Sequence, residues 1–423
     1  MRRIFLCMQL LIGIICTCKA QVTGDTLVLT LPEAEKLFLQ KNLALISQQY
    51  NIDINKALVQ QARYWDNPVL LTDQNLYDGK FFRHTKVDNQ PYGQIYLQLQ
   101  QVIKTAGKRN KLVQLANDNV LSATQQFNDL MRNLKFVLIT DFTNLHQLLG
   151  THAIYSKEAD AMQKLAAGMD AQFQTGNISQ KDNIRIKSLL FSLQSDLADV
   201  QRQITEVQKE LHTLLQQSGN NVIVPVINEP AVNGSLTLNQ LQDSAINNRP
   251  DWQLAKINLL AQEHNLSYQK SLAVPDLTVG IEYDRLSNYV PNFWGLTIGL
   301  PIPVFNRNKG NIMAAGTAIR QATNTVLQVQ NQAQQDVQTA YNKYLIAANL
   351  KKISPPELGE QYDRLFQNVI TGYQQRQISL IEFVDFFDAY KESTVKKLQQ
   401  QTSLLNAIAE INFTTGANII TIQ

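Results

Sequence analysis

Two kinds of hydrophobic periodicity alternate along the chain. Apolar residues at every second position occur in two pairs of short segments, at about 69–103 and about 276–304. This alternation predicts β-strands with one apolar and one polar face, joined in each pair by a polar loop. Much longer segments repeat apolar residues every three or four positions, which predicts amphipathic helices. The pattern therefore predicts a mixed α/β protein with two β-hairpins and several long helices.

The alternation assigns one side of each predicted strand to an apolar face. Polar residues, such as Tyr96, Gln98 and Gln100, take the opposite side. The residues assigned to the apolar side are Val69, Leu71, Ile95, Leu97 and Leu99 in the first hairpin, and Leu277, Val279, Ile281, Tyr283, Leu296, Ile298 and Leu300 in the second.

The predicted helices are too long for a compact globular domain. No proline occurs between about 107 and 175, and one helix over this range would be ~100 Å long at ~1.5 Å per residue. After a turn at Gly176 and Asn177, a returning helix runs to about 217. Its apolar residues alternate in steps of four and three, which is the seam of a coiled coil: Leu193, Leu197, Val200, Ile204, Val207, Leu211 and Leu214.

The chain also contains an internal duplication. The segment "LTLPEAEKLFLQKN" from Leu29 matches "LTLNQLQDSAINNR" from Leu236, and three further matches follow in the same order. We therefore predict a first repeat at 21–235, with a helix, the hairpin at about 69–103, long helices at about 105–217 and a linker at 218–235. The second repeat, 236–423, has a helix, the hairpin at about 276–304, long helices at about 309–412 and a C-terminal tail. Pro355 and Pro356 predict a break in its long helices.

The first twenty residues have the features of a secretory signal. Two arginines precede an apolar run from Ile4 to about Cys16, and small or polar residues follow up to Ala20. A lipoprotein signal is the alternative, because Cys16 and Cys18 lie near the end of that run. All three cysteines fall within residues 1–20, so cleavage after Ala20 would leave an exported protein without disulfides.

Composition and motifs argue against several function classes. A formal net charge of +3 in 423 residues is too small to indicate nucleic-acid binding. The sequence has no nucleophile elbow, phosphate loop, paired cysteines or His-Glu-x-x-His motif, so we expect neither enzymatic activity nor a cofactor. We predict no metal site, because the five histidines are scattered: His84, His146, His152, His212 and His264.

The hairpins and the long helices can be explained together by a membrane conduit. An isolated hairpin is unstable in water, and its open edges pair with other chains. A bilayer accepts strands only in a closed barrel, and two hairpins per chain suit one sector of a barrel built from several copies. The apolar side would then face lipid and the polar side a watery lumen. The long helices would extend the conduit beyond the membrane.

Two motifs and the duplicated plan resemble the TolC family of outer-membrane efflux channels. The motifs are "LPIPVFNRNKGNI" at 300–312 and the Tyr-x-x-x-x-Ile-Ser-x-x-Glu turn from Tyr373, and the first is similar to the branch that exports cobalt, zinc and cadmium. The resemblance spans essentially the whole mature chain. It implies a homotrimer with a twelve-stranded barrel, four strands per protomer, in the outer membrane of a Gram-negative bacterium. It also implies a twelve-helix tunnel in the periplasm, a periplasmic adaptor protein and an inner-membrane pump of the RND type.

The resemblance also implies where functional residues lie. Glu382 and Asp385 match a pair of aspartates that form an acidic, cation-selective constriction at the periplasmic aperture, and Asp182 is the acidic counterpart in the first repeat. The alternative is that these carboxylates only complement the N-terminal end of their helix. Two further sets are implied. The turns expected to dock the adaptor, or simply to cap helices, contain Gly176, Ile178, Ser179, Ile378 and Ser379; the barrel-to-tunnel junction contains Pro301, Pro303, Asn306, Gly310, Pro68 and Pro275.

We therefore expect a passive outer-membrane channel of a tripartite efflux system that exports heavy-metal cations or drugs. Two alternatives remain open. A type I secretion conduit has the same architecture, and an exported coiled-coil scaffold or adhesin would also contain long helices.

Overall fold

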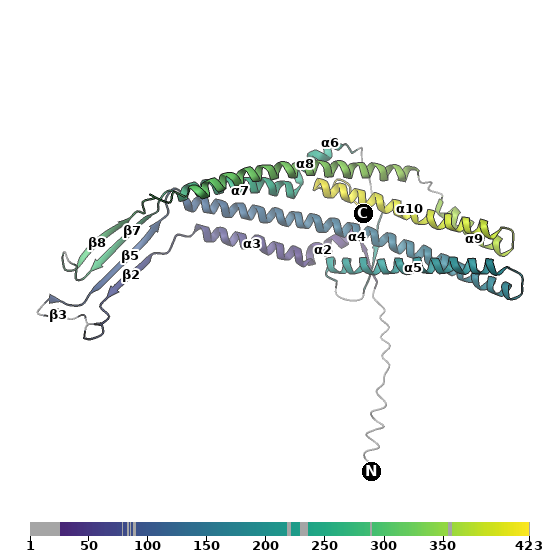
Figure 1. The fold of residues 1–423 in the computed structure, drawn as a ribbon, viewed down its shortest axis with the longest axis horizontal. Coiled ribbons are helices and arrows are strands. Elements are labelled where there is room, and N and C mark those ends of the chain that lie inside the picture. The colour runs from purple at the N-terminus through teal and green to yellow at the C-terminus, as the bar shows by residue number, and fades with distance from the viewer. Residues whose placement is uncertain are drawn as a thin grey trace, which may run out of the picture.

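The computed structural model is an elongated molecule with a β-sheet at one end and long helices running away from it (Figure 1). It describes residues 26–422 except 78, 83, 85, 88–89, 218–220, 229–235, 288–289 and 354–357. The predicted signal at 1–20 and the predicted break at Pro355 and Pro356 lie outside the described residues. Within the described ranges, no helix combines the length and apolar character needed to cross a membrane.

The elements follow the mixed α/β pattern expected from the sequence, with most residues in helices. The strands are β1 (Thr26–Thr30), β2 (Val69–Gln74), β3 (Lys86–Val87), β4 (Gln90–Pro91), β5 (Ile95–Ile103), β6 (Val222–Val226), β7 (Leu277–Asp284) and β8 (Phe293–Gly299). The helices are α2 (Leu31–Lys41), α3 (Leu43–Arg63), α4 (Lys108–Gln174), α5 (Gln180–Leu215), α6 (Leu238–Asn248), α7 (Pro250–Leu272), α8 (Lys309–Ile353), α9 (Leu358–Gln374) and α10 (Leu380–Thr415).

The two predicted hairpins join into one antiparallel sheet of four strands. The strand order is β2-β5-β7-β8, so β2 and β8 form the edges. Leu99 of β5 lies opposite Leu70 and Ile281, and Ile281 lies opposite Leu296. Residues directly opposite each other in neighbouring strands share a face. This row therefore runs across the apolar face of all four strands.

The face assigned to two residues of the first strand was wrong. Val69 lies opposite Gln100 and Leu71 lies opposite Gln98, so both share the polar face. Four consecutive residues from Val69 to Thr72 lack a clear alternation, and the hairpin register with β5 decides which of them face outward. Leu300 was also misplaced, because β8 ends at Gly299.

The polar face of the sheet is held by side-chain hydrogen bonds. The Tyr96 hydroxyl donates to Glu282 over 2.9 Å, and the Gln98 amide donates to the Thr297 hydroxyl over 3.0 Å. On the opposite face, large apolar side chains remain exposed, with Ile281 53% and Leu296 67% accessible. Polar side chains of the sheet thus form hydrogen bonds with one another within the single chain, whereas the apolar face is not covered by other described residues.

The helices next to the sheet continue the order of the strands. α3 packs against α4, α4 against α7, and α7 against α8, so α3 and α8 are the outer helices of this layer (Figure 1). α4 has 67 residues, which is ~100 Å at ~1.5 Å per residue. Toward the other end of the molecule, α4 packs against α5 and α10.

The two predicted repeats begin with the same local structure. Each starts with a capping box, made by Thr30 with Glu33 and by Thr237 with Gln240, in which side chain and backbone bond reciprocally at the helix start. The sequence predicted one helix before the first hairpin, but Asn42 separates α2 from α3. Asn42 caps α3 by accepting from the backbone N–H groups of Ala44 and Leu45, and a residue in extended conformation ends the preceding helix.

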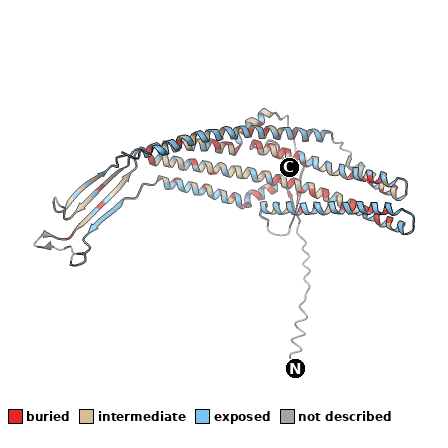
Figure 2. Ribbon diagram, viewed as in Figure 1, coloured by how far each residue is buried: buried red, intermediate tan, exposed pale blue. Residues whose placement is uncertain are grey.

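A parallel pair of strands was not predicted from the sequence. β1 pairs with β6 from Thr26 opposite Val222 to Thr30 opposite Val226, so part of the predicted linker at 218–235 is a strand. The pair covers the middle of the helices, where the larger core lies (Figure 2). Strands this short carry little periodicity, and only their partner, about 196 residues away in sequence, completes the hydrogen bonding.

The predicted coiled-coil seam of α5 is buried at most positions. Leu193, Val200, Ile204, Val207 and Leu211 are buried, whereas Leu197 and Leu214 are half-buried. The last buried position is Leu215 instead of Leu214, because the helix ends there and α2 packs beside it.

Asp141 of α4 is expected to make stability depend on pH. Burial, and secondarily the charge of Glu210, raise the pKa of Asp141 to about 6. Its Oδ2 atom is buried and accepts no hydrogen bond from any described residue. Between its ordinary pKa and about 6, the unfolded chain ionises first, so the folded state loses stability as the pH rises through this window. At ~1.4 kcal/mol per pKa unit, and after allowance for solvent screening of a half-buried group, the loss is on the order of 1–2 kcal/mol.

An Asp141→Asn variant should therefore unfold at a higher denaturant concentration than the wild type at pH 7.5, and the difference should be much smaller at pH 4.5, because most of the window lies above that pH. Circular dichroism at the two pH values measures this. An equal shift at both would assign the effect to packing rather than to ionisation.

Candidate functional site

The second helical tip, between α9 and α10, is built around a capping box. The Glu382 carboxylate accepts from the Ser379 backbone N–H over 2.7 Å, and the Ser379 hydroxyl accepts from the Glu382 backbone N–H over 3.3 Å. Hydrogen bonding to the backbone and side chain of Ser379 lowers the pKa of Glu382. Asp385, one turn further on, is exposed. Glu382 thus does act as a cap, which leaves Asp385 as the carboxylate without a capping role.

The first tip, between α4 and α5, uses a glycine where the second uses an arginine. Gly176 has φ +73°, and its counterpart Arg376 has φ +61°. Ser179 caps α5 by accepting from the Asp182 backbone N–H over 3.1 Å. The side chains of Ile178 and Ile378 pack partly against the core of the tips, so both have a structural role in their turns.

The two tips contact each other within one chain. The Arg376 guanidinium donates to the Asn177 carbonyl over 3.0 Å. Lys391 of α10 forms an ion pair with Asp196 of α5 at 2.9 Å. Burial, and secondarily the charge of Asp182, raise the pKa of Tyr373, which places Asp182 of the first tip near the second tip. The three acidic residues singled out in the sequence therefore lie at the same end of the molecule, far from the sheet (Figure 1).

The strand-to-helix junctions occupy the other end of the helical layer. Pro301, Pro303 and Asn306 lie in the extended segment between β8 and α8, and Gly310 lies in the first turn of α8. Asn306 accepts from the Asn308 backbone N–H over 3.0 Å. These residues thus lie between a strand and a helix, and their role at a barrel-to-tunnel junction stays a prediction.

The junction of the first repeat is tied to that of the second by a buried lysine. Lys108 is 5% exposed, and its ammonium group donates to Asp276 and to the Val274 carbonyl, each over 2.6 Å. Thr105 donates through its hydroxyl to the Pro275 carbonyl over 2.6 Å. Pro68, by contrast, is exposed before β2. The network around Lys108 was not foreseen, because its partners lie more than 160 residues apart in sequence.

Comparison with known proteins gives the same architecture. A model of the family "Outer membrane efflux protein" matches residues 241–417. Over these residues the chain is similar to the outer membrane efflux protein family. The cobalt-zinc-cadmium resistance protein CzcC of Cupriavidus metallidurans is 22% identical over 294 residues, covering 70% of this chain and 67% of that protein. The resemblance to TolC-type channels near the cobalt-zinc-cadmium branch is thereby confirmed.

Solved structures share the fold of this chain. The crystal structure of CusC has a TM-score of 0.73 and 17% identity, and the alignment covers 92% of each chain. The outer membrane protein VceC from Vibrio cholerae has a TM-score of 0.71 and 15% identity, covering 92% of this chain and 96% of that one. The chain therefore has the fold of these outer-membrane proteins.

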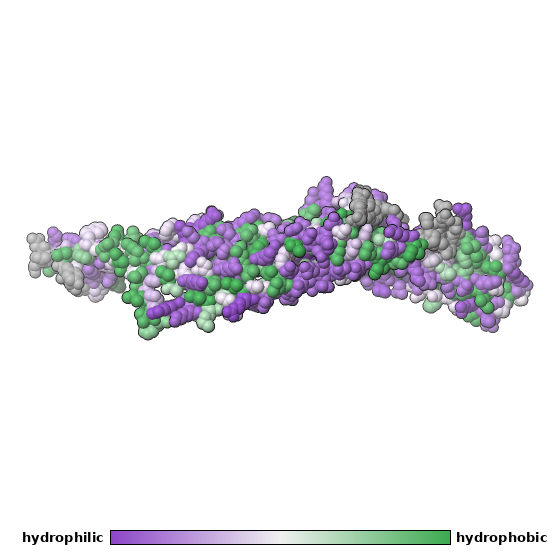
Figure 3. Space-filling model, turned by 90° about the horizontal axis from the view of Figure 1, so that it is seen from above, coloured by the Kyte–Doolittle hydropathy of each residue, from purple (hydrophilic) through white to green (hydrophobic). Residues whose placement is uncertain are grey.

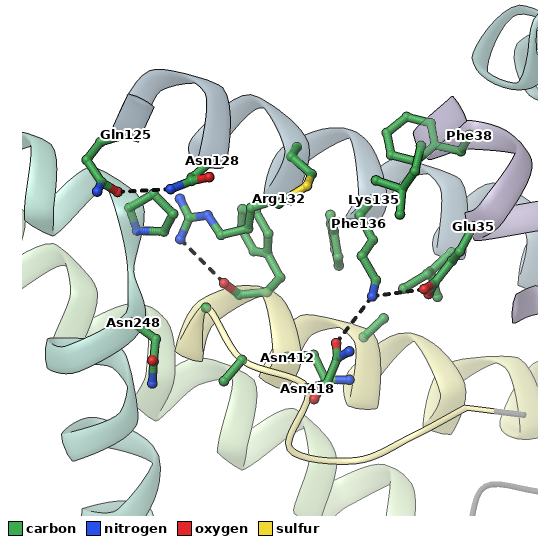
Figure 4. Close-up of a pocket in the computed structure, with 18 residues that line it drawn as sticks. Glu35, Phe38, Gln125, Asn128, Arg132, Lys135, Phe136, Asn248, Asn412 and Asn418 are labelled. Atoms are coloured by element: carbon green, nitrogen blue, oxygen red, sulfur yellow. Dashed lines mark hydrogen bonds and ion pairs between the residues drawn. The ribbon is translucent and has the colours of Figure 1, made fainter. Parts of the chain in front are cut away.

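A cavity of about 440 Å³ lies midway along the molecule, where α2, α4 and the end of α10 meet (Figure 4). Its charged groups pair with one another or with neighbours. Lys135 forms an ion pair with Glu35 at 3.0 Å, and Arg132 forms one with Asp129 at 2.7 Å. Phe136 stacks on Phe413 with ring centroids 4.7 Å apart. The cavity is lined by none of the residues singled out in the sequence.

Three of the histidines, His146, His212 and His264, make structural hydrogen bonds. His264 bonds to Asp118 over 2.6 Å, and His212 bonds to the Asn221 carbonyl over 2.8 Å. Among the described residues, no three His, Cys, Asp or Glu side chains are grouped so that they could hold a metal ion. His264 pairs with Asp118 of another helix, not with its sequence neighbour Glu263, and only the packing of α4 on α7 brings that pair together.

Proposed function

We propose that three copies of this efflux protein close into one channel, the outer-membrane component of a tripartite efflux system. The observation that carries this proposal is that the described chain has two open lateral edges. β2 and β8 each lack a neighbour on one side of the sheet, and open strand edges pair with other strands. The outer helices lie on the same two edges, because α3 directly precedes β2 and α8 directly follows β8.

The outer helices expose apolar side chains that a water-soluble single chain would bury. A stripe of this kind needs a partner surface. Two different edges that fit each other form a heterologous contact, which closes into a ring when the rotation permits. The exposed residues are Leu43 61%, Tyr50 63%, Ile54 59% and Leu58 52% on α3, and Met313 74%, Leu327 54%, Ile346 63% and Ile353 75% on α8.

Three copies of the four-stranded sheet would make a barrel of twelve strands. The apolar row through Leu99 and Ile281 would face lipid, and the hydrogen-bonded polar face would line a watery lumen. The long helices would form the tunnel wall in the periplasm. A passive conduit of this kind depends on an adaptor and an inner-membrane pump of the RND type to supply its cargo.

The proposed cargo is a heavy-metal cation or a drug. The relative named for cobalt, zinc and cadmium resistance supports metals, and the acidic tip is compatible with cations. Deleting the chain should increase sensitivity to zinc, cobalt and cadmium if metals are the cargo, and growth on a panel of metals, dyes and antibiotics measures this. Unchanged metal sensitivity with increased drug sensitivity would assign the cargo to drugs. A secretion conduit would instead lose export of a protein substrate.

The oligomer is tested by the mass of the detergent-solubilised protein. Light scattering coupled to size exclusion should give three chains per particle, and planar bilayers should show channels. A particle with one chain would contradict the proposal.

We further propose that Glu382, Asp385 and Asp182 form an acidic constriction at the tip, next to the turns of Gly176, Ile178, Ser179, Ile378 and Ser379 that would dock the adaptor. A ring of carboxylates attracts cations and repels anions. Glu382 also caps α10, so replacing it with alanine would change both properties. Glu382→Gln removes the charge, and glutamine can still complete the capping box.

A Glu382→Gln/Asp385→Asn double variant should therefore lower cation selectivity, measured as the reversal potential in a salt gradient, and weaken block by multivalent cations. Ser379→Ala, which removes the cap and keeps the carboxylates, is the matched control. If only the control changes the recordings, the carboxylates stabilise the start of α10 and do not affect ion selectivity.

A further inference from the structure

The segment from Leu300 to Phe305, between β8 and α8, exposes its apolar side chains. Phe305 is completely exposed, and Ile302 is 79% accessible. Hydrophobic residues gather at the strand end of the molecule and at its junction with the helices (Figure 3). A fully exposed phenyl ring is unfavourable in water, because burying it would be worth ~1.5–3 kcal/mol. The ring therefore calls for a partner surface.

The backbone of this segment is fixed even though its side chains are exposed. Pro301 and Pro303 restrict its dihedral angles. The Arg307 side chain donates to the Pro303 carbonyl over 3.2 Å, and the Asn308 amide donates to the Gln269 carbonyl of α7 over 2.7 Å. A rigid segment presents Phe305 in one direction, so little conformational entropy would be lost when the ring is bound.

The opposite edge of the molecule carries a small recess at the same strand-to-helix level. This junction recess, about 120 Å³ in volume, is formed where α3 leads into β2 and β5 leads into α4, and it is lined by Tyr64, Trp65, Asp66, Lys104, Arg109 and Asn110. Its size is comparable to the ~150 Å³ of an apolar cavity that accommodates benzene.

The recess offers an aromatic and cationic wall. The Arg109 guanidinium lies 4.1 Å from the centre of the Trp65 ring, and Trp65 is 60% exposed. Lys104 forms an ion pair with Asp66 at 3.0 Å. A guanidinium plane has two faces, and Trp65 covers one of them. An additional aromatic ring could stack on the other face or on Trp65 itself.

We propose that Phe305 of one copy inserts into the junction recess of the next copy and fixes the register of the ring where barrel and tunnel meet. This inference rests on the proposed trimer and deepens it. The segment follows the edge strand β8, the recess adjoins the edge strand β2, and these two edges face each other around a closed ring. In this contact, the uncharged ring of Phe305 binds in the junction recess of a second copy of this chain.

Paired cysteines test the contact directly. All three natural cysteines lie at positions 7, 16 and 18, within the predicted signal, so its cleavage would leave a background free of other thiols. A disulfide forms only when the two Cβ atoms lie ~3.5–4.5 Å apart. Phe305→Cys with Asn110→Cys should, on oxidation, link chains into species of two and three on a denaturing gel without reductant. Asn110→Cys with Ile381→Cys is the control, because Ile381 is also highly exposed, at 81%, but lies at the helical tip.

The outcomes separate this proposal from the trimer itself. A wild type that is trimeric by light scattering, with no link through 305 and 110, overturns the insertion and leaves the channel intact. A monomeric wild type overturns both. As a second measurement, Phe305→Ala should lower the temperature at which the trimer dissociates by several degrees, whereas Ile381→Ala should not. Equal effects of the two variants would also contradict the insertion.

Discussion

An Arg249→Met variant should lose much of the stability of the helical layer. The Arg249 side chain is 5% exposed and forms ion pairs with Asp251 at 2.7 Å and with Asp336 at 3.0 Å. It lies between α6 and α7 and also reaches α8. Removing one member of a buried ion pair costs ~3–5 kcal/mol, because the remaining carboxylates stay partly desolvated. Chemical denaturation followed by circular dichroism measures the loss.

The matched control is Arg202→Met on α5. Arg202 also has two acidic partners, Asp199 at 3.4 Å and Glu206 at 3.3 Å, but its side chain is 63% exposed. Ion pairs this exposed contribute little to stability, so the control should unfold almost as the wild type does. Similar losses in the two variants would refute a special role for the buried site.

The effect at Arg249 should also depend on pH. Burial favours a higher pKa for Asp251, but the hydrogen bonds and charges of Arg249 and Arg132 outweigh it, and its pKa is lowered. A lowered pKa means that the pair stabilises the fold above the ordinary Asp value and that this contribution disappears as the pH falls through the lower, folded-state value. The difference in free energy of unfolding between the Arg249→Met variant and the wild type should therefore become smaller at strongly acidic pH.

A Leu99→Lys variant should fail to accumulate in the outer membrane. Leu99 lies in the apolar row of the sheet, opposite Leu70 and Ile281. A lysine on the lipid face of a barrel costs ~2–4 kcal/mol near the bilayer midplane, and a trimer would carry three of them. Immunoblots of isolated outer membranes measure the amount of assembled protein.

Gln100→Lys, one position along the same strand, is the control. Gln100 lies on the polar face, where its amide donates to Gln98 over 2.6 Å. A lysine there would point into water, so assembly should be largely preserved. If Gln100→Lys is lost and Leu99→Lys is retained, the two faces of the sheet are assigned the wrong way round.

The sequence predicted the helix cap at the second tip, but not the contact between the two tips. Ser379 and Glu382 have the spacing of a capping box, and local spacing is enough to form one, since all its hydrogen bonds are made within four residues. The link between Arg376 and Asn177 could not be predicted in this way. These residues are about 200 positions apart, and nothing in either turn marks the other as its partner.

The sequence by itself determined the two hairpins of the four-stranded sheet and the long proline-free helix, because periodicity and proline act on the local backbone. Only the tertiary structure decided the register that turns Val69 and Leu71 to the polar face, the pairing of β1 with β6, and the burial of Lys108 and Arg249. Each of these depends on which distant segment supplies a hydrogen bond or a counter-charge. The sequence around a residue does not indicate which distant segment will pack against it, because the free energy of burial comes from contact with that segment.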